Sequence, residues 1–488
     1  MIKQRSGSFF RQMVFCWAGI LVITAGLAGA GQGEVLDIGS RRELFVDRYL
    51  IEKMEGTRLV LHRPYDEGTV LKFDKPWEGA FCGYCTVIKD EGTYRFYYRG
   101  LANAGKDYSL DEVTCYAESR DGIHLTKPNL GIYDVKGTKN NNVILAKAAP
   151  VTHNFSPFLD TRKGVDKKER FKALGGSKKS GLLGYVSGDG IHWRKLQEEP
   201  LITKGAFDSQ NVAFWSESEN CYLCYFRTFF EGCRSVSRTS STDFVHWSEP
   251  VEMSYGDTVR EQLYTNQTHP YFRAEHIYVA VAARFMPGRQ IITKEEAERL
   301  NVNPGYFKDC SDGVLMSSRG GNSYDRTFME GFIRPGVGLE NWVSRTNYPA
   351  LNVVQTGEAE MSIYVQHNYA QASAHLRRYV LRVDGFASVN APYQGGGVTT
   401  KGLKFKGKKL LLNFATSAAG SIKVEIQDKE GKPIPGYTLK DCKELVGNFI
   451  EREVSWKGST DVSSLEGKAV RLYFELKDAD LYAVQFVQ

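Results

Sequence analysis

Short polar segments stand directly in front of apolar, strand-like runs at several places in the sequence. In "HNFSPFLD" (153–160) a histidine and an asparagine precede the run, and "FDSQN" (207–211), "TNQTH" (265–269) and "TGEAE" (356–360) are similarly polar. Amides and imidazoles around a few carboxylates suit a ligand with many hydroxyl groups, because each hydroxyl both donates and accepts a hydrogen bond. If these segments gather at one place, they predict a pocket for such a ligand.

The carboxylates among these residues point to the hydrolysis of a glycosidic bond. That reaction needs two carboxyl groups beside the bond, one as proton donor and the other as nucleophile or base. The predicted catalytic residues are Asp208 and Glu360, with Glu358 and Glu261 in reserve. Structural roles stay open: Asp208 could cap a turn, and Glu358 and Glu360 share one face of an extended segment, so one of them could be solvated or paired with arginine.

The remaining polar residues of these segments, with a few neighbours, are predicted to hold the sugar. The predicted substrate-binding residues are Glu78, His153, Asn154, Gln210, Asn211, Gln267, His269 and Trp215. Further aromatic candidates for stacking on a sugar ring are Trp77, Tyr84, Phe207 and Tyr264. We expect the two histidines to act as hydrogen-bonding groups, so neither a metal nor a cofactor is predicted. A calcium ion held by histidines and carbonyl groups is the alternative.

A repeated turn indicates which elements must position these residues. It occurs as "SRDGIHL" (119), "SGDGIHW" (187), "STDFVHW" (241), "SRGGNSY" (318) and, more weakly, "RVDGFAS" (382). A strand-like segment rich in aromatic and β-branched residues precedes each turn, and in most units another short apolar run precedes that segment. Five units of about four antiparallel strands, each with one signature turn, are typical of a β-propeller. Unrelated hairpins in a sandwich are the alternative.

The predicted fold is therefore all-β: a five-bladed β-propeller over residues 35–394, followed by a C-terminal β-sandwich over 395–488. In a propeller the innermost strand of each blade runs along the central axis, so the polar segments would surround one funnel. The clearest helical pattern, "ITKEEAERLNVNPG" (292–305), is expected as an insertion between blades four and five. The sandwich could bind carbohydrate or brace the propeller.

The first thirty residues have the pattern of a secretory signal peptide. Lys3, Arg5 and Arg11 precede an apolar stretch that ends in small residues near Ala30. We therefore expect a secreted or periplasmic protein that is not held at the membrane after cleavage, with an uncleaved anchor as the alternative. The formal net charge of +6 falls to +3 without these three basic residues, which gives no support to nucleic acid as a partner. The oligomeric state is not predicted.

Two cysteine pairs have the spacing of zinc ligands, "CGYC" (82–85) and "CYLC" (221–224). The second pair lies in an alternating, strand-like run, where residues three apart point to opposite faces of the strand. Buried thiols or a few disulfides are therefore favoured over zinc.

Several longer segments resemble a known group of proteins. "LFVDRYLIE", "YAESRDGIHLTKPNLG", "HNFSPFLD", "FDSQNVAFW", "EMSIYV" and "AHLRRYVLRVDGFASV" are similar to secreted bacterial proteins related to glycoside hydrolase families 32 and 43. The resemblance implies a five-bladed propeller and a glycosidase-like function. The chain departs from those families at two acids: residues 82–84 offer no carboxylate, and Ser156-Pro157 stands where an Asp-Pro is expected. Only Asp208 has a counterpart, so Glu360 or Glu78 would have to replace a missing acid.

The residues and the resemblance together predict a secreted glycoside hydrolase that acts on a poly- or oligosaccharide through a carboxylate pair in the funnel. The alternative is a carbohydrate-binding propeller without catalysis, which is consistent with the missing acids.

Overall fold

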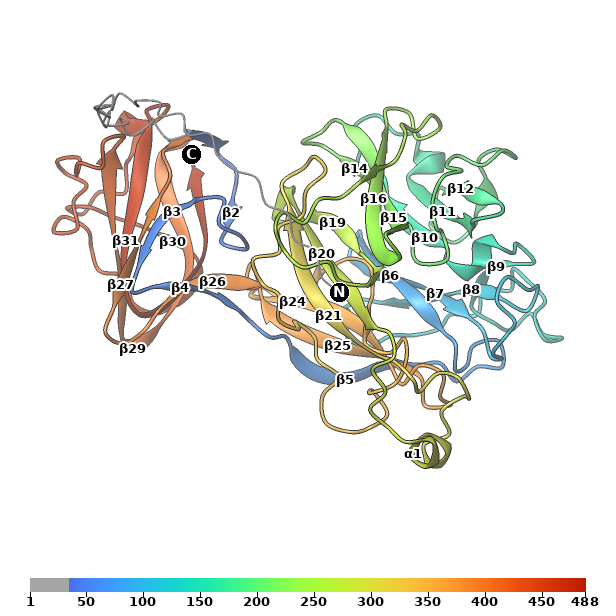
Figure 1. Ribbon diagram of the computed structural model, residues 1–488. Coiled ribbons are helices and arrows are strands. Elements are labelled where there is room, and N and C mark those ends of the chain that lie inside the picture. Colours follow the sequence, from blue (N-terminus) through green and yellow to red (C-terminus); the bar gives the residue numbers. More distant parts are fainter. Residues whose placement is uncertain (1–34) are drawn as a thin grey trace, which may run out of the picture. The chain divides into compact units, whose positions relative to one another are not determined.

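The computed structural model describes residues 35–488, so the predicted signal peptide (1–30) lies outside the described residues. The described chain is almost entirely β-structure, as predicted, with a single short α-helix. Five separate antiparallel sheets follow one another along the sequence between Tyr65 and Arg382, and a sixth sheet combines strands from both ends of the described chain. The five sheets are the blades of the predicted propeller (Figure 1).

The first three blades each have four strands in chain order, from the axis outward. Blade one consists of β6 (Gly83–Asp90), β7 (Thr93–Gly100), β8 (Val113–Ser119) and β9 (Val143–Ala146). Blade two consists of β10 (Ser156–Leu159), β11 (Phe171–Ser177), β12 (Gly181–Ser187) and β13 (Arg194–Lys195). Blade three consists of β14 (Val212–Ser216), β15 (Cys221–Phe230), β16 (Cys233–Ser241) and β17 (Val251–Glu252).

The innermost strands of the last two blades are interrupted. Blade four consists of β18 (Leu263–Thr265) and β19 (Thr268–Tyr271), which both pair with β20 (Ala274–Met286), and of β21 (Cys310–Ser318). Blade five consists of β22 (Tyr348–Pro349), β23 (Val354–Gln355), β24 (Glu360–His367), β25 (His375–Arg382) and β5 (Tyr65–Lys72). Its outermost strand thus comes from the beginning of the described chain, and Figure 1 shows the blue β5 beside the orange β25.

The ring of blades is closed at the axis. A backbone bridge joins Thr86 on the innermost strand of blade one to Leu351 in blade five. At the far ends of the innermost strands, residues of all five blades line one cavity of about 220 Å³, among them Ile88, Phe158, Phe214 and Pro270. The five sheets therefore surround a common axis.

The repeated turns lie at equivalent places in the blades. Each follows the third strand of its blade, at Ser119, Ser187, Ser241, Ser318 and Arg382. In blade two the Asp189 carboxylate accepts hydrogen bonds from the backbone of Ile191 and His192 and contacts the His192 ring at 2.7 Å. One carboxylate thereby holds the turn closed, and His192 has a structural role in it.

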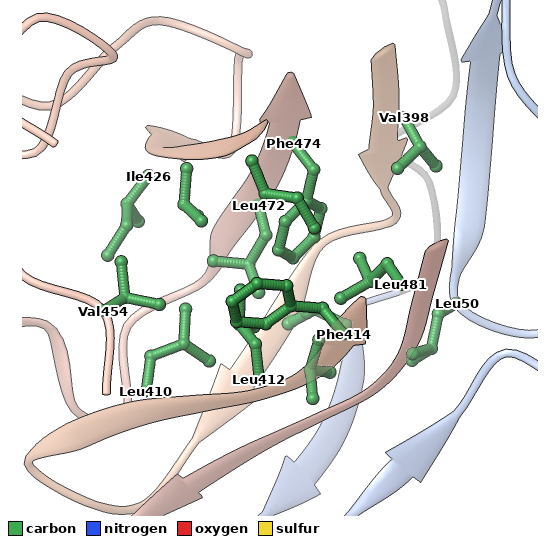
Figure 2. Packing of buried hydrophobic residues seen from close by; sticks show 14 of the residues in the cluster. Leu50, Val398, Leu410, Leu412, Phe414, Ile426, Val454, Leu472, Phe474 and Leu481 are labelled. Atoms are coloured by element: carbon green, nitrogen blue, oxygen red, sulfur yellow. The ribbon is translucent and has the colours of Figure 1, made fainter. Parts of the chain in front are cut away.

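The sixth sheet surrounds a separate apolar core. Its strands are β1 (Leu36–Gly39), β2 (Glu43–Leu44), β3 (Ile51–Glu55), β4 (Arg58–Leu61), β26 (Ala387–Ala391), β27 (Gly396–Thr400), β28 (Leu403–Phe405), β29 (Lys409–Asp428), β30 (Asn448–Glu453) and β31 (Val470–Val487). Figure 2 shows part of the core, in which Leu412, Phe414 and Phe474 are fully buried. This part of the chain corresponds to the predicted C-terminal sandwich.

Three segments lie elsewhere than expected. Residues 36–61 and 387–391, predicted within the propeller range 35–394, belong to the sixth sheet, because β3 pairs with β27 and β26 pairs with β4 and β31. Helix α1 (Lys294–Arg299), with a capping box at Thr293, lies between β20 and β21 of blade four and not between blades four and five. The other helical segments are single 3₁₀ turns, η1 (Val151–His153), η2 (Lys167–Glu169) and η3 (Ser463–Leu465).

The eight cysteines of the described chain are all free thiols, and six of them are buried. None of the helices in residues 35–488 is long and apolar enough to cross a membrane.

Candidate functional site

Residues that precede or begin the innermost strands meet around one end of the axis, which we call the mouth. Tyr84 and His153, from blades one and two, have ring centroids 5.7 Å apart, and His153 contacts Asp208 of blade three at 3.1 Å. Tyr264 of blade four and Tyr348 of blade five have centroids 5.2 Å apart. Tyr84, His153, Asp208 and Tyr264, predicted for the funnel, therefore lie together at the mouth, and blade five contributes Tyr348 in place of the predicted segment "TGEAE".

Glu112, His153 and Asp208 form a chain of contacting side chains on the side of the mouth next to blade one. The buried carboxylate of Glu112, which precedes β8, lies 2.7 Å from Nδ1 of His153, and Asp208 lies 3.1 Å from Nε2. Each ring nitrogen of His153 therefore faces one carboxylate.

Asp208 is the exposed end of this chain, with 52% of its side chain accessible to solvent. Burial raises the pKa of its carboxyl group, but the hydrogen bond from His153 and the charges of His153 and Arg227 outweigh this effect and hold the pKa well below its usual range. The Tyr108 hydroxyl also donates to Asp208 at 2.9 Å, and the Tyr108 ring lies 4.3 Å from the His153 ring. Asp208 is thus an ionised carboxylate, fitted to act as a base or nucleophile or to accept hydrogen bonds from hydroxyl groups.

The backbone next to Asp208 is fixed by two buried amides. The carbonyl oxygen of Phe207 accepts hydrogen bonds from Nδ2 of Asn154 at 2.6 Å and from Nδ2 of Asn211 at 3.1 Å. Asn154 also exchanges two hydrogen bonds with the backbone of Gly176. Asn154 and Asn211, predicted to bind substrate, are fully buried and instead hold the loop that presents Asp208.

Arg99 contacts this chain of side chains at the imidazole ring of His153. Its guanidinium donates to the carbonyl oxygen of Phe81 and to the Tyr369 hydroxyl, and lies 3.2 and 3.3 Å from the two ring nitrogens of His153. Such nearly equal distances place it against the ring, and the Tyr84 ring lies over the same guanidinium at 4.8 Å. Tyr84 has a φ of +52°, which is uncommon for a large residue, and a register irregularity of β6 lies at the same place.

One group of side chains here has the composition of a metal site. Asp107, Glu112 and His153 offer ligand atoms within 4.8 Å of one another. Glu112 is already hydrogen-bonded to His153 and to the backbone N–H of Tyr108, and the Arg99 guanidinium contacts the same histidine. A divalent cation would have to displace these bonds beside a fixed positive charge, so we assign no metal to this group.

The two glutamines predicted to bind substrate form a glutamine belt (Gln210 and Gln267) across the axis. Gln210 donates to the carbonyl oxygen of Cys85 and to the Thr86 hydroxyl of blade one, and accepts from Gln267 at 2.8 Å. Gln267 donates in turn to the carbonyl oxygen of Pro349 in blade five. Both side chains are fully enclosed, so the belt links blades and does not face the mouth.

Three other predicted binding residues also have structural positions. His269 is buried between the carbonyl oxygen of Gln267 and the backbone N–H of Val353, and burial lowers its pKa to about 4. Trp215 is the last residue but one of β14 and lines the cavity at the far ends of the innermost strands. Glu78 is fully buried and accepts hydrogen bonds from Tyr98 and Lys127, each at 2.6 Å.

The structure does not bring Glu358 or Glu360 to Asp208. The innermost strand of blade five is β22 with β23, so "TGEAE" forms the hairpin that leads into β24 at the other end of the blade. Glu360 accordingly lies one strand length from the mouth, about 25 Å at about 3.3 Å per residue, and pairs with Arg378. The reserve candidate Glu261 is bound to Arg284 and Arg326.

Three of the mouth residues that the sequence did not single out come from one loop, 101–112, between β7 and β8. It contributes Asp107, Tyr108 and Glu112 to the mouth. The loop carries neither a repeat nor an apolar period, and it lies about forty residues before His153 in the chain. Only the clustering of its acidic and aromatic residues in a long inter-strand connection could have indicated a role.

The sequence matches no protein-family model and no curated protein. Among solved structures, the chain is similar to an N-acetylgalactosamine deacetylase from F. plautii, with 11% identity over 67% of this chain and 96% of that one and a TM-score of 0.43. It is also similar to a β-1,2-mannobiose phosphorylase from Listeria innocua, with 10% identity over 66% and 97% of the two chains and a TM-score of 0.42. An α-L-arabinofuranosidase of glycoside hydrolase family 43 from Clostridium thermocellum is 12% identical over 60% and 88%, with a TM-score of 0.38.

Proposed function

We propose that the protein hydrolyses a glycosidic bond in a carbohydrate bound at the mouth, with Asp208 as its reactive carboxylate. The observation that carries the proposal is the state of Asp208: it is half exposed, ionised, and held by His153 and Tyr108 at the mouth, where side chains of the five blades lie together. A fixed, ionised carboxylate of this kind can act as nucleophile or as the base that activates water.

Asp107 is the candidate for the second carboxylate. Its side chain is exposed, and its distance to the His153 and Glu112 ligand atoms, with the His153–Asp208 contact, places it within about 10 Å of Asp208. Carboxyl groups about 5 to 9.5 Å apart serve the two-carboxylate mechanisms. Asp107 would donate the proton to the leaving group, and Asp208 would attack the sugar or activate water.

Aromatic side chains at the mouth suit a sugar ring. Tyr84 and Tyr108 are half-buried beside His153, and Phe229, at the end of β15, is 54% exposed with the Arg227 guanidinium 5.5 Å from its ring. An exposed ring of this kind offers an apolar face to the C–H groups of a sugar, while its neighbours supply hydrogen bonds.

The test separates catalysis from binding. The secreted form of the protein is screened for hydrolysis and for binding against a panel of plant and algal polysaccharides, with Asp208→Asn and Asp107→Asn beside wild type. We expect each variant to lose at least about 100-fold in turnover and to retain affinity, because the amide keeps the shape but not the proton chemistry. The control is Asp134→Asn, an exposed aspartate on another loop, which should change neither.

Two results would decide against the proposal. Binding by wild type without any turnover would indicate a carbohydrate-binding propeller without catalysis. Turnover that survives Asp208→Asn would show that the chemistry takes place elsewhere.

A further inference from the structure

Three arginines surround one tyrosine on the side of the mouth opposite Glu112. Their guanidinium carbons lie 4.9 Å (Arg227), 5.5 Å (Arg234) and 5.9 Å (Arg345) from the centroid of the Tyr264 ring. Arg227 and Arg234 come from β15 and β16 of blade three, and Arg345 precedes β22 of blade five. We call these three residues the arginine cluster.

The arginine cluster has fewer carboxylate contacts than it has positive charges. Within residues 35–488 its single carboxylate contact is Arg227 to Asp208 at 3.5 Å, and Arg234 hydrogen-bonds only the neutral side chain of Gln262. The Nε atoms of all three arginines are buried without a hydrogen-bond partner in the described chain, and Arg227 as a whole is only 6% exposed. The buried hydroxyl of Tyr348, whose ring packs on Tyr264, also has no partner.

Other enclosed arginines of the chain show what is missing here. Arg326 and Arg284 share the Glu261 carboxylate, and Arg238 donates twice to Glu219. A buried charge without an opposite charge is costly, so such groups are normally paired. Three neighbouring guanidinium groups with a single carboxylate contact in residues 35–488 therefore indicate a place for an anion.

We propose that the arginine cluster binds an oxyanion carried by the substrate, so that the sugar is acidic: a uronate or a sulfate ester. This inference rests on the proposed function, because it names the substrate of the same site. Guanidinium groups bind carboxylate and sulfate oxygens through paired N–H donors, and the Tyr348 hydroxyl adds one more donor.

The position of the cluster also fixes which sugar carries the charge. Arg227 contacts both Asp208 and the Tyr264 ring, so the anion site and the reactive carboxylate share a side chain. The charged residue is therefore one of the two sugars joined by the bond that is cleaved, and not a distant part of the polymer.

The experiment compares matched glycans. Binding of uronate-containing and sulfated oligosaccharides is measured by calorimetry beside their carboxyl-reduced and desulfated counterparts, for wild type, Arg345→Gln and Arg234→Gln. Arg345 has no ion pair in the described chain, so its replacement should leave the fold intact. The control is Arg120→Gln, an exposed arginine that hydrogen-bonds only Thr93.

We expect wild type to prefer an acidic glycan about tenfold or more over its neutral counterpart, with an affinity that falls as salt is added. Arg345→Gln and Arg234→Gln should each remove most of that preference, and Arg120→Gln none of it. Equal affinity for the acidic and the neutral form, or an affinity unchanged in both cluster variants, would overturn the inference.

Inorganic phosphate is tested separately, since a free oxyanion has the same chemistry as a bound one. If phosphate alone binds with dependence on Arg345 and a neutral glycan is cleaved only in its presence, the charge does not belong to the sugar and the inference is overturned. Charge-dependent binding of an acidic glycan without hydrolysis would contradict the proposed function and still support the arginine cluster as its anion site.

Discussion

Replacement of Gln210 by leucine is expected to destabilise the propeller without weakening the binding of a carbohydrate. The prediction follows from the glutamine belt, in which Gln210 is enclosed and contacts three groups on other blades. Leucine has nearly the volume of glutamine, so the change removes hydrogen bonds and leaves only a small change in packing.

The magnitude follows from what each partner loses. The carbonyl oxygen of Cys85 keeps the backbone N–H of Leu351 as a donor, and Nε2 of Gln267 keeps the carbonyl oxygen of Pro349, so each loss costs about 1 kcal/mol. The buried Thr86 hydroxyl loses its partner in the belt, which costs about 1 to 3 kcal/mol. Together these losses amount to a decrease of about 3 to 5 kcal/mol in the free energy of unfolding.

The assay is urea denaturation followed by tryptophan fluorescence, together with glycan binding by the folded variant. Gln267→Leu and the double variant complete a cycle in which the two glutamines should show a coupling of about 1 kcal/mol, since they share one hydrogen bond. Gln197→Ala, at a partly exposed position whose side chain hydrogen-bonds only the nearby Glu199 backbone, is the control and should change the stability by less than about 0.5 kcal/mol.

A loss of glycan affinity in Gln210→Leu at unchanged stability would refute this reasoning, because it would show that Gln210 contacts the glycan. A decrease of less than about 1 kcal/mol would show that the belt does not link the blades energetically.

Two further predictions concern residues that the sequence placed in the site. Burial lowers the pKa of His269 to about 4, so this imidazole is protonated at lower pH in the folded protein than in the unfolded chain. Its contribution should therefore lower the free energy of unfolding by about 2 kcal/mol between pH 7 and pH 5. His269→Gln should remove that part of the pH dependence in urea denaturation at the two pH values, and an unchanged slope would contradict it. Glu360→Gln should leave the turnover number within about twofold of wild type, because its carboxylate lies at the other end of blade five; a loss of 100-fold would place Glu360 in the reaction after all.

The blades were predictable because their signals are local. The turn at Asp189 needs a serine, an aspartate and a glycine within four residues, and its hydrogen bonds stay within the turn. A turn of this kind can be recognised in the sequence wherever it recurs, so its five copies predict the number and order of the blades. The weakest copy, after Arg382, still follows the third strand of its blade.

Blade five shows where such reasoning fails. Its innermost strand consists of two separate pairs of residues, β22 and β23, and Asn352 between them has a φ of +77°. Neither an alternating pattern nor a continuous apolar run survives this break. The next polar segment, "TGEAE", was therefore assigned to the mouth, and Glu360 was paired with Asp208 although it lies at the opposite end of its blade.

The binding residues could not be separated from structural ones by residue type. Asparagine and glutamine at strand entries satisfy backbone groups where neighbouring innermost strands do not pair, as Asn154 does for Gly176 and Phe207. The same amides would serve equally well for a sugar. Conversely, Tyr108 and Glu112 reach the mouth through tertiary contacts with His153 and Asp208, and no pattern in the chain records such contacts.

The position of a residue relative to the innermost strand separates mouth residues from structural residues, which residue type does not. His153 lies three residues ahead of β10 and Asp208 four ahead of β14, and both side chains face the mouth, whereas Tyr264 reaches it from within β18. Gln210 and Gln267 lie one or two residues ahead of the same kind of strand and belong to the enclosed frame. The last residues before a strand are already fixed by its first hydrogen bonds, whereas those a turn earlier are free to point over the axis. In this propeller the chemistry is therefore expected from the earlier position, which is also where Arg345 precedes β22.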